Sequence, residues 1–521
     1  MTKPYLMGLD AGTTIVKSVV FDQKGKSLAV ASRRLELEHP KPGWAEHDML
    51  SVWNAAKRSI REALERAHAS PQDVAGLGLS GMGASLWLID GRGKPVRKAI
   101  TWLDSRSKHI LDEWRESGLS EHFYDITGWR LFTGIGPPIL YPWLKENEPK
   151  SLERARWCLR AKDWIRYRLT GEICSDESDM SVGLFEVGRR EYSQKVLDLC
   201  RIEDYAHTLP RLTKSWEISG EVTSGAAKET GLNAGTPVAT GAYDVCSTAL
   251  GAGAIEVGQA LAIVGTAGIY NAISDKAILD KQRKVACGCH CVPDKWMLNC
   301  QAMLAGPNLD WFLDKFYSFE KSEATKKRAN IYGLCNRLVE RVPPGSLGII
   351  YHPFLEGEIG PFVKPTARAG FFGIGAWHKR EHLLRAVYEG VAYSMRDNFI
   401  ELARNFEGTG IGISEVRLTG GGARSPAWTR ILSDVTGHQM RMPLEEECGC
   451  LGAAMNAGIA VGLFRNHREA VDKAVRIRGE VAPSKEAWDK YSALFAIYRR
   501  LYQAVSDEWD RLYDVVGTIS S

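Results

Sequence analysis

One pattern occurs twice in this chain: an apolar strand, a tight turn made of small residues and threonine, and a second apolar strand. The first copy begins at Tyr5 and has its turn at residues 11–14, and the second spans residues 258–273 with its turn at residues 265–268. Copies separated by about 250 residues indicate two halves built on one plan. The chain has 521 residues, which is enough for one domain in each half. We therefore expect two domains, at residues 1–248 and 249–521.

The segments around these turns alternate between strand and helix patterns. Apolar runs predict strands at residues 16–21, 27–32 and 74–80, and a helical period runs from residue 49 to residue 68. This alternation is typical of the α/β class. Residues 485–516 place aromatic side chains at helical spacing, which predicts one amphipathic helix whose aromatic face packs in a core or against another subunit. If the aromatic face packs against another subunit, the protein is a homodimer through this helix.

Charge and hydropathy exclude two classes of partner. The chain has 67 Lys and Arg against 63 Asp and Glu, a net charge of +4 with no long basic run, so we expect no nucleic-acid partner. No apolar stretch approaches the roughly 20 residues that a membrane-spanning helix needs, so we expect no membrane partner. The first residues enter a strand without the features of a secretory signal. These features predict a cytoplasmic protein.

The cysteines predict reduced thiols. Eleven cysteines are scattered over the chain, an odd number that does not suit a disulfide framework. The one cluster, Cys287, Cys289, His290 and Cys291, lacks the spacing of a zinc site and has no second pair of ligands at a suitable distance. We therefore expect buried thiols here and assign no metal to this cluster.

The two turns have the residues of a polyphosphate site. In the first turn Gly12 lets the backbone approach a ligand, Thr13 and Thr14 offer donors, and Lys17 adds a positive charge. Asp10 can hold Mg²⁺ directly or through water. The second turn repeats the pattern with three residues: Gly265, Thr266 and Gly268. Either turn alone is compatible with an ordinary polar hairpin, but two such turns can hold a polyphosphate from both sides.

A third glycine cluster lies between a predicted strand and a predicted helix. Gly420, Gly421 and Gly422 follow the apolar residues 415–418 and precede a helical stretch near Pro426. Bare backbone at such a turn can accept a flat ring or a phosphate group. The cluster lacks the G-K-[ST] ending of a P-loop. Residues 81–83 likewise lack the third glycine of a dinucleotide fingerprint.

Asp244 is the candidate general base. It directly follows an apolar strand and precedes the expected domain crossing, where a carboxylate can accept a proton from a substrate hydroxyl group. At its usual pKa of about 3.9 it is ionised at neutral pH. The alternative is a carboxylate that caps the helix expected at residues 246–252.

With these residues in place, the chain resembles the FGGY carbohydrate kinases of the actin-like ATPase superfamily along nearly its whole length. Residues 369–374 (AGFFGI) and 382–389 (HLLRAVYE), seven residues apart, match the second signature of the family. Further landmarks occur in the expected order at residues 42–48, 169–171, 241–244 and 450–454. In the first signature Leu140 stands where the family has Lys.

The resemblance implies two ribonuclease H-like domains, with ATP and a small-molecule sugar meeting in the cleft between them. It implies ATP and Mg²⁺ as cofactors and Asp244 as the catalytic base. The nucleotide side would comprise the three turns together with Lys17, Gly306 and Asp310.

The resemblance also indicates the sugar. Trp102, Asp104 and Arg106 resemble the W-x-D-x-R segment on the substrate side of pentulose kinases, which favours a ketopentose such as L- or D-xylulose. The Q-M-H-G stretch expected of D-xylulose kinases reads Met82-Gly83-Ala84-Ser85 here, so a polar group near the sugar is missing. The overall pattern is nearer to the L-xylulose kinase branch. The alternatives are a kinase of an erythritol-like polyol and a non-catalytic actin-like ATP-binding protein.

Overall fold

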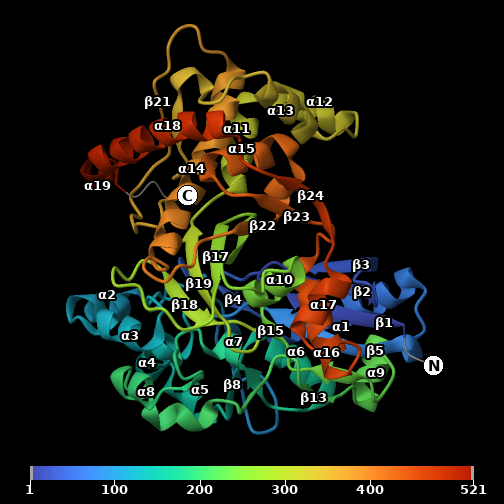
Figure 1. The fold of residues 1–521 in the computed structure, drawn as a ribbon. Helices are drawn as coiled ribbons and strands as arrows, with labels where there is room; N and C mark the ends of the chain where they lie inside the picture. Colours follow the sequence, from blue (N-terminus) through green and yellow to red (C-terminus); the bar gives the residue numbers. More distant parts are fainter. Residues whose placement is uncertain (1–3, 518–521) are drawn as a thin grey trace. The chain divides into compact units, whose positions relative to one another are not determined.

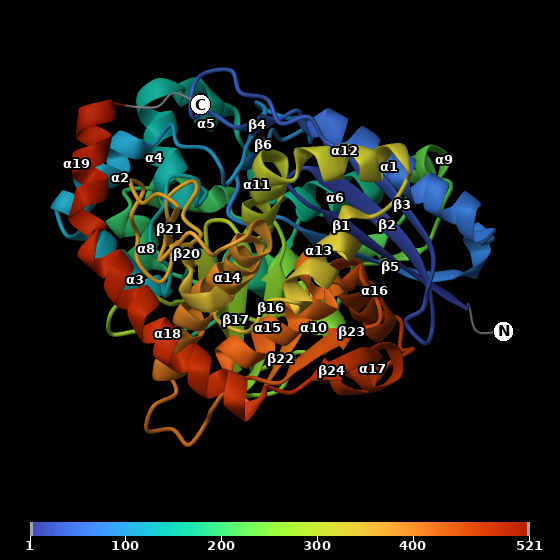
Figure 2. The same ribbon diagram turned by 90° about the horizontal axis from the view of Figure 1, so that it is seen from above.

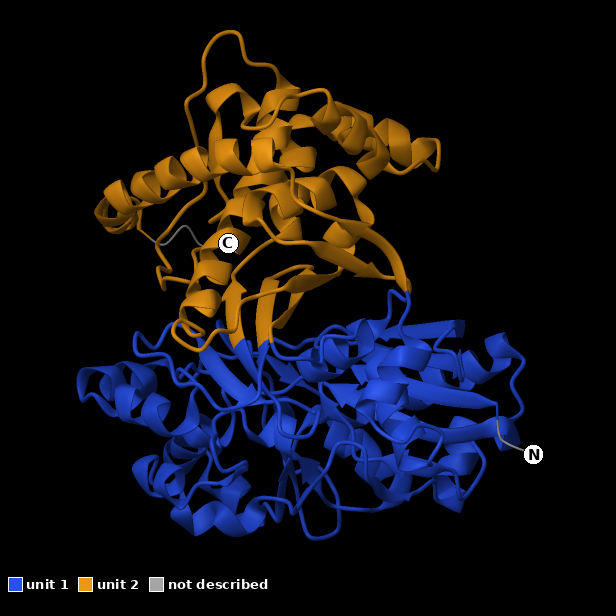
Figure 3. Ribbon diagram, in the orientation of Figure 1, with its two compact units in different colours: residues 1–257, 273–298, 445–476 blue, residues 258–272, 299–444, 477–521 orange. Residues whose placement is uncertain are grey.

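The computed structural model describes residues 4–517 and divides the chain into two compact units (Figure 3). Unit 1 comprises residues 1–257, 273–298 and 445–476, and unit 2 comprises residues 258–272, 299–444 and 477–521. The expected division was one cut at residues 248/249. The units instead interleave along the chain, because two later segments return to unit 1.

Unit 1 is built on a mixed seven-stranded sheet (Figure 1). The predicted meander is confirmed: β1 (Tyr5–Ala11), β2 (Ile15–Asp22) and β3 (Ser27–Arg34) pair antiparallel in that order. On its other side β1 pairs in parallel with the buried strand β5 (Val74–Gly81). The sheet is completed by β13 (Ile218–Glu221), β14 (Pro237–Ala239) and β15 (Ala242–Tyr243).

Helices cover this sheet and close its core. The predicted helix at residues 49–68 is α1 (Met49–Ala67), which lies across β2 and β3 in Figure 2 and buries Trp53 and Ile60. The other helices of unit 1 are α2 (Lys108–Glu116), α3 (Leu119–Thr127), α4 (Pro137–Asn147), α5 (Pro149–Arg154), α6 (Ala161–Thr170), α7 (Glu177–Met180), α8 (Gln194–Leu199), α9 (Ser224–Thr230), α10 (Asp244–Ala252), α16 (Cys448–Ala460) and α17 (His467–Ala474). Short strands complete the unit: β4 (Glu46–His47), β6 (Trp87–Ile89), β7 (Ala99–Ile100), β8 (Trp157–Leu159), β9 (Ser175–Asp176), β10 (Phe185–Glu186), β11 (Glu191–Tyr192) and β12 (Leu212–Thr213).

Glycines explain why α16 returns to unit 1. A Cβ atom at Gly8 of β1 would lie 1.9 Å from the carbonyl oxygen of Cys450, and one at Gly78 of β5 would lie 1.8 Å from that of Ala453. Gly452 of α16 makes the same kind of approach to α10, because its Cβ would lie 1.9 Å from the Ser247 oxygen. Missing side chains thus let backbone pack directly on backbone.

The second sheet repeats the plan of the first. Its order is β18-β19-β17-β16-β22-β23-β24. Strand β16 (Gln259–Val264) pairs antiparallel with β17 (Gly268–Ser274) and parallel with β22 (Glu415–Thr419), just as β1 pairs with β2 and β5. The remaining strands of the sheet are β18 (Ala286–Cys289), β19 (Trp296–Ala302), β23 (Met440–Pro443) and β24 (Ile477–Val481). The repeat of the strand–turn–strand pattern and the α/β class are therefore confirmed.

The helices of unit 2 include the aromatic segment. It forms two helices, α18 (Lys485–Ala504) and α19 (Ser506–Val516), where the sequence predicts one. Tyr491, Phe495, Tyr498 and Tyr502 are buried within unit 2, so the aromatic face is used in the core. The other elements are α11 (Gly306–Phe316), α12 (Ser318–Lys326), α13 (Ile331–Glu340), α14 (Arg380–Arg404), α15 (Pro426–Thr436), β20 (Ile350–His352) and β21 (Gly370–Phe372).

Two kinds of feature are absent from the described residues. No helix within residues 4–517 is long and apolar enough to cross a membrane. No group of three or more His, Cys, Asp or Glu side chains there is arranged to hold a metal ion, and the cysteines at 287, 289 and 291 are free and buried.

Candidate active site

The register of the first sheet brings Asp10 and Asp244 to one edge of unit 1. Asp10 pairs with Lys17 across the β1–β2 ladder and with Ser80 across the β1–β5 ladder. Ser80 pairs in turn with Ala242 of β15, and Asp244 follows two residues later. The two aspartates identified from the sequence therefore lie at the same edge, on strands that flank β5.

Asp244 has the environment of a base. It is the half-buried first residue of α10, and the N-cap of this helix is Tyr243, so Asp244 does not take the capping position considered above. Burial raises the pKa of its carboxyl group well above the usual range, and the carboxylates of Asp10 and Asp179 raise it further. A raised pKa makes this carboxylate a stronger proton acceptor.

Asp10 has an unsatisfied oxygen. Its Oδ1 atom is buried and has no hydrogen-bond partner among the described residues. Burial raises the pKa of this carboxyl group, although Ser80 and Lys17 oppose the effect. An orphaned carboxylate oxygen at a strand end fits a hard divalent cation, which prefers oxygen ligands.

The first turn is held at its base. The Gly12 amide donates to the Ile15 carbonyl at 3.1 Å, and the Thr13 hydroxyl accepts a hydrogen bond from Trp102 Nε1 at 2.9 Å. Thr14 is exposed. Hence the turn leaves one threonine for a ligand while the other is joined to the predicted sugar-side segment.

The ammonium group of Lys17 is already paired. Its Nζ atom lies 2.7 Å from Oε2 of Glu447, which directly precedes α16. Sequence reasoning did not identify Glu447, since it lies 430 residues from Lys17 and belongs to a run of three glutamates. The positive charge expected to face phosphate is neutralised in this structure.

Asp104 and Arg106 lie inside unit 1. The carboxylate of Asp104 accepts from the amide of Ala45 at 2.7 Å and from Nε of Arg106 at 2.8 Å. Arg106 also donates a hydrogen bond to Glu46, and its Cζ atom lies 3.8 Å from the centroid of the Trp44 ring. Both side chains are fully buried, which favours a supporting role for them.

The other two residues predicted for the sugar side adjoin the first turn. Met82 and Gly83 are buried just after β5, and the Met82 amide donates to the Ala11 carbonyl at 3.0 Å. The Thr13 hydroxyl lies 3.6 Å from the Met82 sulfur atom. Trp102, Met82 and Gly83 are thus brought together at the first turn.

A buried charged cluster behind Asp244 was not identified from the sequence. Lys162 forms ion pairs with Asp163, Asp176 and Asp179 at 2.8, 3.0 and 3.2 Å, and all four side chains are fully buried. Burial raises the pKa of Asp179 to about 7, although Lys162 lowers it. The signal in the sequence is the acidic and serine-rich run at residues 175–181, in which every residue but Met180 is polar.

The second turn lies in unit 2 and contacts the start of α11. The Gly306 amide donates to the Gly265 carbonyl at 2.8 Å, and the Ala305 amide donates to the Thr266 carbonyl at 2.8 Å. The Thr266 residue itself is exposed. Asp310, one turn along α11, is exposed and accepts a hydrogen bond from the Tyr332 hydroxyl at 2.7 Å.

The third glycine cluster adjoins the second turn. Gly420 has φ +85° and lies against Val264, because a Cβ atom would come 2.6 Å from the Val264 oxygen. Gly421 is exposed with nothing within 4 Å of a Cβ position, so its backbone is open to a flat ligand. A cavity of about 880 Å³ begins at Ala423 and Arg424, directly after this turn. The predicted nucleotide residues of unit 2 are therefore gathered at one sheet edge.

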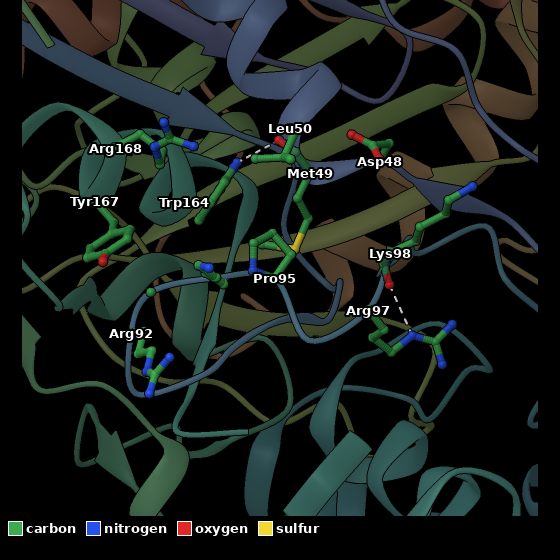
Figure 4. A pocket seen from close by; sticks show the side chains of 12 residues that line it. Asp48, Met49, Leu50, Arg92, Pro95, Arg97, Lys98, Trp164, Tyr167 and Arg168 are labelled. Carbon is green, nitrogen blue, oxygen red and sulfur yellow. Dashed lines mark hydrogen bonds between the residues drawn. The ribbon is translucent and has the colours of Figure 1, made fainter. Parts of the chain in front are cut away.

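A cavity of about 620 Å³ in unit 1 is lined by none of the residues predicted for the site (Figure 4). Its walls include Met49, Pro95 and Trp164, and Figure 4 shows the charged ends of Arg97 and Lys98 pointing away from these residues. Those two cations already bond carboxylates of the same unit: Glu46, Glu148 and Glu38.

Comparison with known proteins identifies the family. Residues 5–251 match the N-terminal domain and residues 260–461 the C-terminal domain of the FGGY family of carbohydrate kinases. The chain is 31% identical over 502 residues to an L-xylulose/3-keto-L-gulonate kinase of Escherichia coli, covering 96% of this chain and 97% of the relative. It is also 31% identical over 502 residues to a probable L-xylulose kinase of Pasteurella multocida, covering 96% and 99%.

A solved structure agrees with this result. The xylulose kinase from Rhodospirillum rubrum matches with a TM-score of 0.85 and 28% identity, covering 97% of this chain and all of that one. These matches favour a sugar kinase over the alternative of a non-catalytic actin-like ATP-binding protein. The chain belongs to the FGGY family of carbohydrate kinases and is an ATP-dependent sugar kinase.

Proposed function

We propose that this kinase phosphorylates a hydroxyl group of a ketopentose, xylulose of the L or D series, with Asp244 as the general base. The observation that carries the proposal is the half-buried Asp244 carboxylate, whose pKa is raised and which lies at the same sheet edge as Asp10. The relatives named as L-xylulose kinases support the choice of sugar. Because phosphoryl transfer requires chiefly positioning and charge stabilisation, one modest base is sufficient.

Each unit by itself offers residues that would contact ATP or its metal. In unit 2 the exposed Thr266 and the backbone of Gly421 would contact the phosphates and the adenosine of ATP. In unit 1 the unpaired Oδ1 of Asp10 would hold Mg²⁺, which when bound neutralises phosphate charge. Since ATP is the donor, we place the enzyme in the cytoplasm. A homodimer stays a prediction, because the aromatic face of α18 is taken up by its own unit.

The test measures ADP release with Mg-ATP against L-xylulose, D-xylulose, both ribuloses, 3-keto-L-gulonate, erythritol, glycerol and gluconate, with a blank without sugar. We expect strong release with one of the two xyluloses. Erythritol as the best substrate would favour the polyol alternative, and release with no ketopentose would reject the proposal.

Asp244→Asn tests the base. The amide cannot accept the proton, so we expect kcat to fall by about 10²–10⁴-fold while ATP binding, measured by calorimetry, changes little. Turnover close to that of the unaltered enzyme would remove Asp244 as the base.

A further inference from the structure

Gly83 is a glycine because of the space around it. Its backbone does not adopt a positive φ, so conformational freedom does not require glycine here. A Cβ atom at this position would lie 2.9 Å from Oδ1 of Asp179 and 2.9 Å from both Cδ2 and Cε2 of Tyr243. The ring of Tyr243 and the carboxylate of Asp179 therefore occupy the volume that a side chain at position 83 would take.

Tyr243 is held firmly in this place. Its strand β15 pairs with β5, with Tyr243 opposite Gly81, and its amide donates to the Ser178 hydroxyl at 3.0 Å. Asp179, the other neighbour of Gly83, pairs with Lys162 Nζ at 3.2 Å. A larger residue at position 83 would therefore have to displace the Tyr243 ring or the Asp179 carboxylate.

The phenol group of Tyr243 is free for a ligand. The residue is half-buried, and among residues 4–517 the only hydrogen bond of Tyr243 to a side chain is that of its backbone amide to Ser178. Burial, together with the nearby carboxylates of Asp244 and Asp179, raises the phenol pKa well above its usual value, so the group stays a hydrogen-bond donor. It directly precedes Asp244 in the chain.

We propose that Tyr243, seated on Gly83, is a specificity-determining residue that donates a hydrogen bond to a sugar hydroxyl group other than the one phosphorylated. The proposal rests on the proposed function, because it assumes that the sugar binds beside Asp244. It adds a residue that distinguishes sugars by the position of a second hydroxyl group.

Tyr243→Phe removes the hydroxyl and keeps the ring. We expect the KM for the preferred ketopentose to rise about 3–10-fold, the value of one neutral hydrogen bond, with kcat and the KM for ATP within twofold. The ratio of kcat/KM for xylulose to kcat/KM for ribulose should move closer to one. Tyr167→Phe, on α6 in the wall of the 620 Å³ cavity, is the matched control and should leave every constant unchanged.

Gly83→Ala tests the shared space. The added methyl group should displace the ring and raise the sugar KM, and this effect should shrink when Tyr243→Ala has already removed the ring, so the double variant is non-additive. Melting temperatures establish that each variant is folded. If the unaltered enzyme is active on a ketopentose and Tyr243→Phe has the same KM and sugar preference, the role of Tyr243 is overturned. The proposed function then still stands. An unaltered enzyme without ketopentose activity overturns the proposed function.

Discussion

At the scale of single residues, burial separates the groups that we propose to act on ligands from the groups that hold the fold. Asp244 and Tyr243 are half-buried at a sheet edge, whereas Asp104 and Arg106 of the pentulose-kinase segment are fully buried and bonded to each other. A buried ion pair cannot reach a sugar without first breaking. The sequence alone does not reveal that this ion pair is buried. The reason is that Glu46, the second carboxylate bonded to Arg106, lies 60 residues away in the chain.

Asp104→Ala should therefore reduce stability more than it changes specificity. Removing the carboxylate leaves Arg106 buried with Glu46 as its remaining carboxylate partner, a change that costs about 3–5 kcal/mol for a buried pair. Urea unfolding measures the loss, and the order of preference among sugars should stay the same. Asp112→Ala, which breaks the exposed pair with Lys108 on α2, should cost less than about 1 kcal/mol. A changed sugar order with normal stability would return Asp104 to the substrate.

At the scale of elements, the contacts of α16 depend on absent side chains. Gly452→Ala would place a methyl carbon 1.9 Å from the Ser247 oxygen, so α16 and α10 must separate. We expect a loss of about 3 kcal/mol or more, read from the urea midpoint. Gly225→Ala in α9 meets nothing closer than 3.9 Å and should be neutral or gain about 0.5–1 kcal/mol. Equal midpoints for the two variants would contradict this account.

The elements also show which parts of the fold a sequence can predict. The period of β1 and α1 is local, so both were predicted within a few residues, and the two glycine turns followed from the repeat. The partner of α16 was not predicted. This helix is apolar on nearly all sides, so no hydrophobic face indicates a direction, and the glycines that receive it lie in distant strands. The break between α18 and α19 at Val505 was likewise hidden within one helical period.

At the scale of the whole molecule, the interleaved units predict how fragments behave. A fragment of residues 1–257 lacks α16 and leaves uncovered the faces of β1, β5 and α10 on which it packs. We expect it to bind a hydrophobic dye and to melt without a cooperative transition, whereas the full chain melts cooperatively. Adding residues 445–476 through a flexible linker should restore part of the transition. A cooperative fragment that binds no dye would mean that unit 1 does not need α16.

The same arrangement means that unit 1 cannot be completed until late in synthesis. Residue 476 emerges 219 residues after residue 257, which at a typical rate of synthesis takes about 10–45 s. During that interval the nascent first half exposes a glycine-lined apolar surface that only a later helix can seal. Each new copy therefore needs shielding from aggregation and from proteases until residues 445–476 have been made.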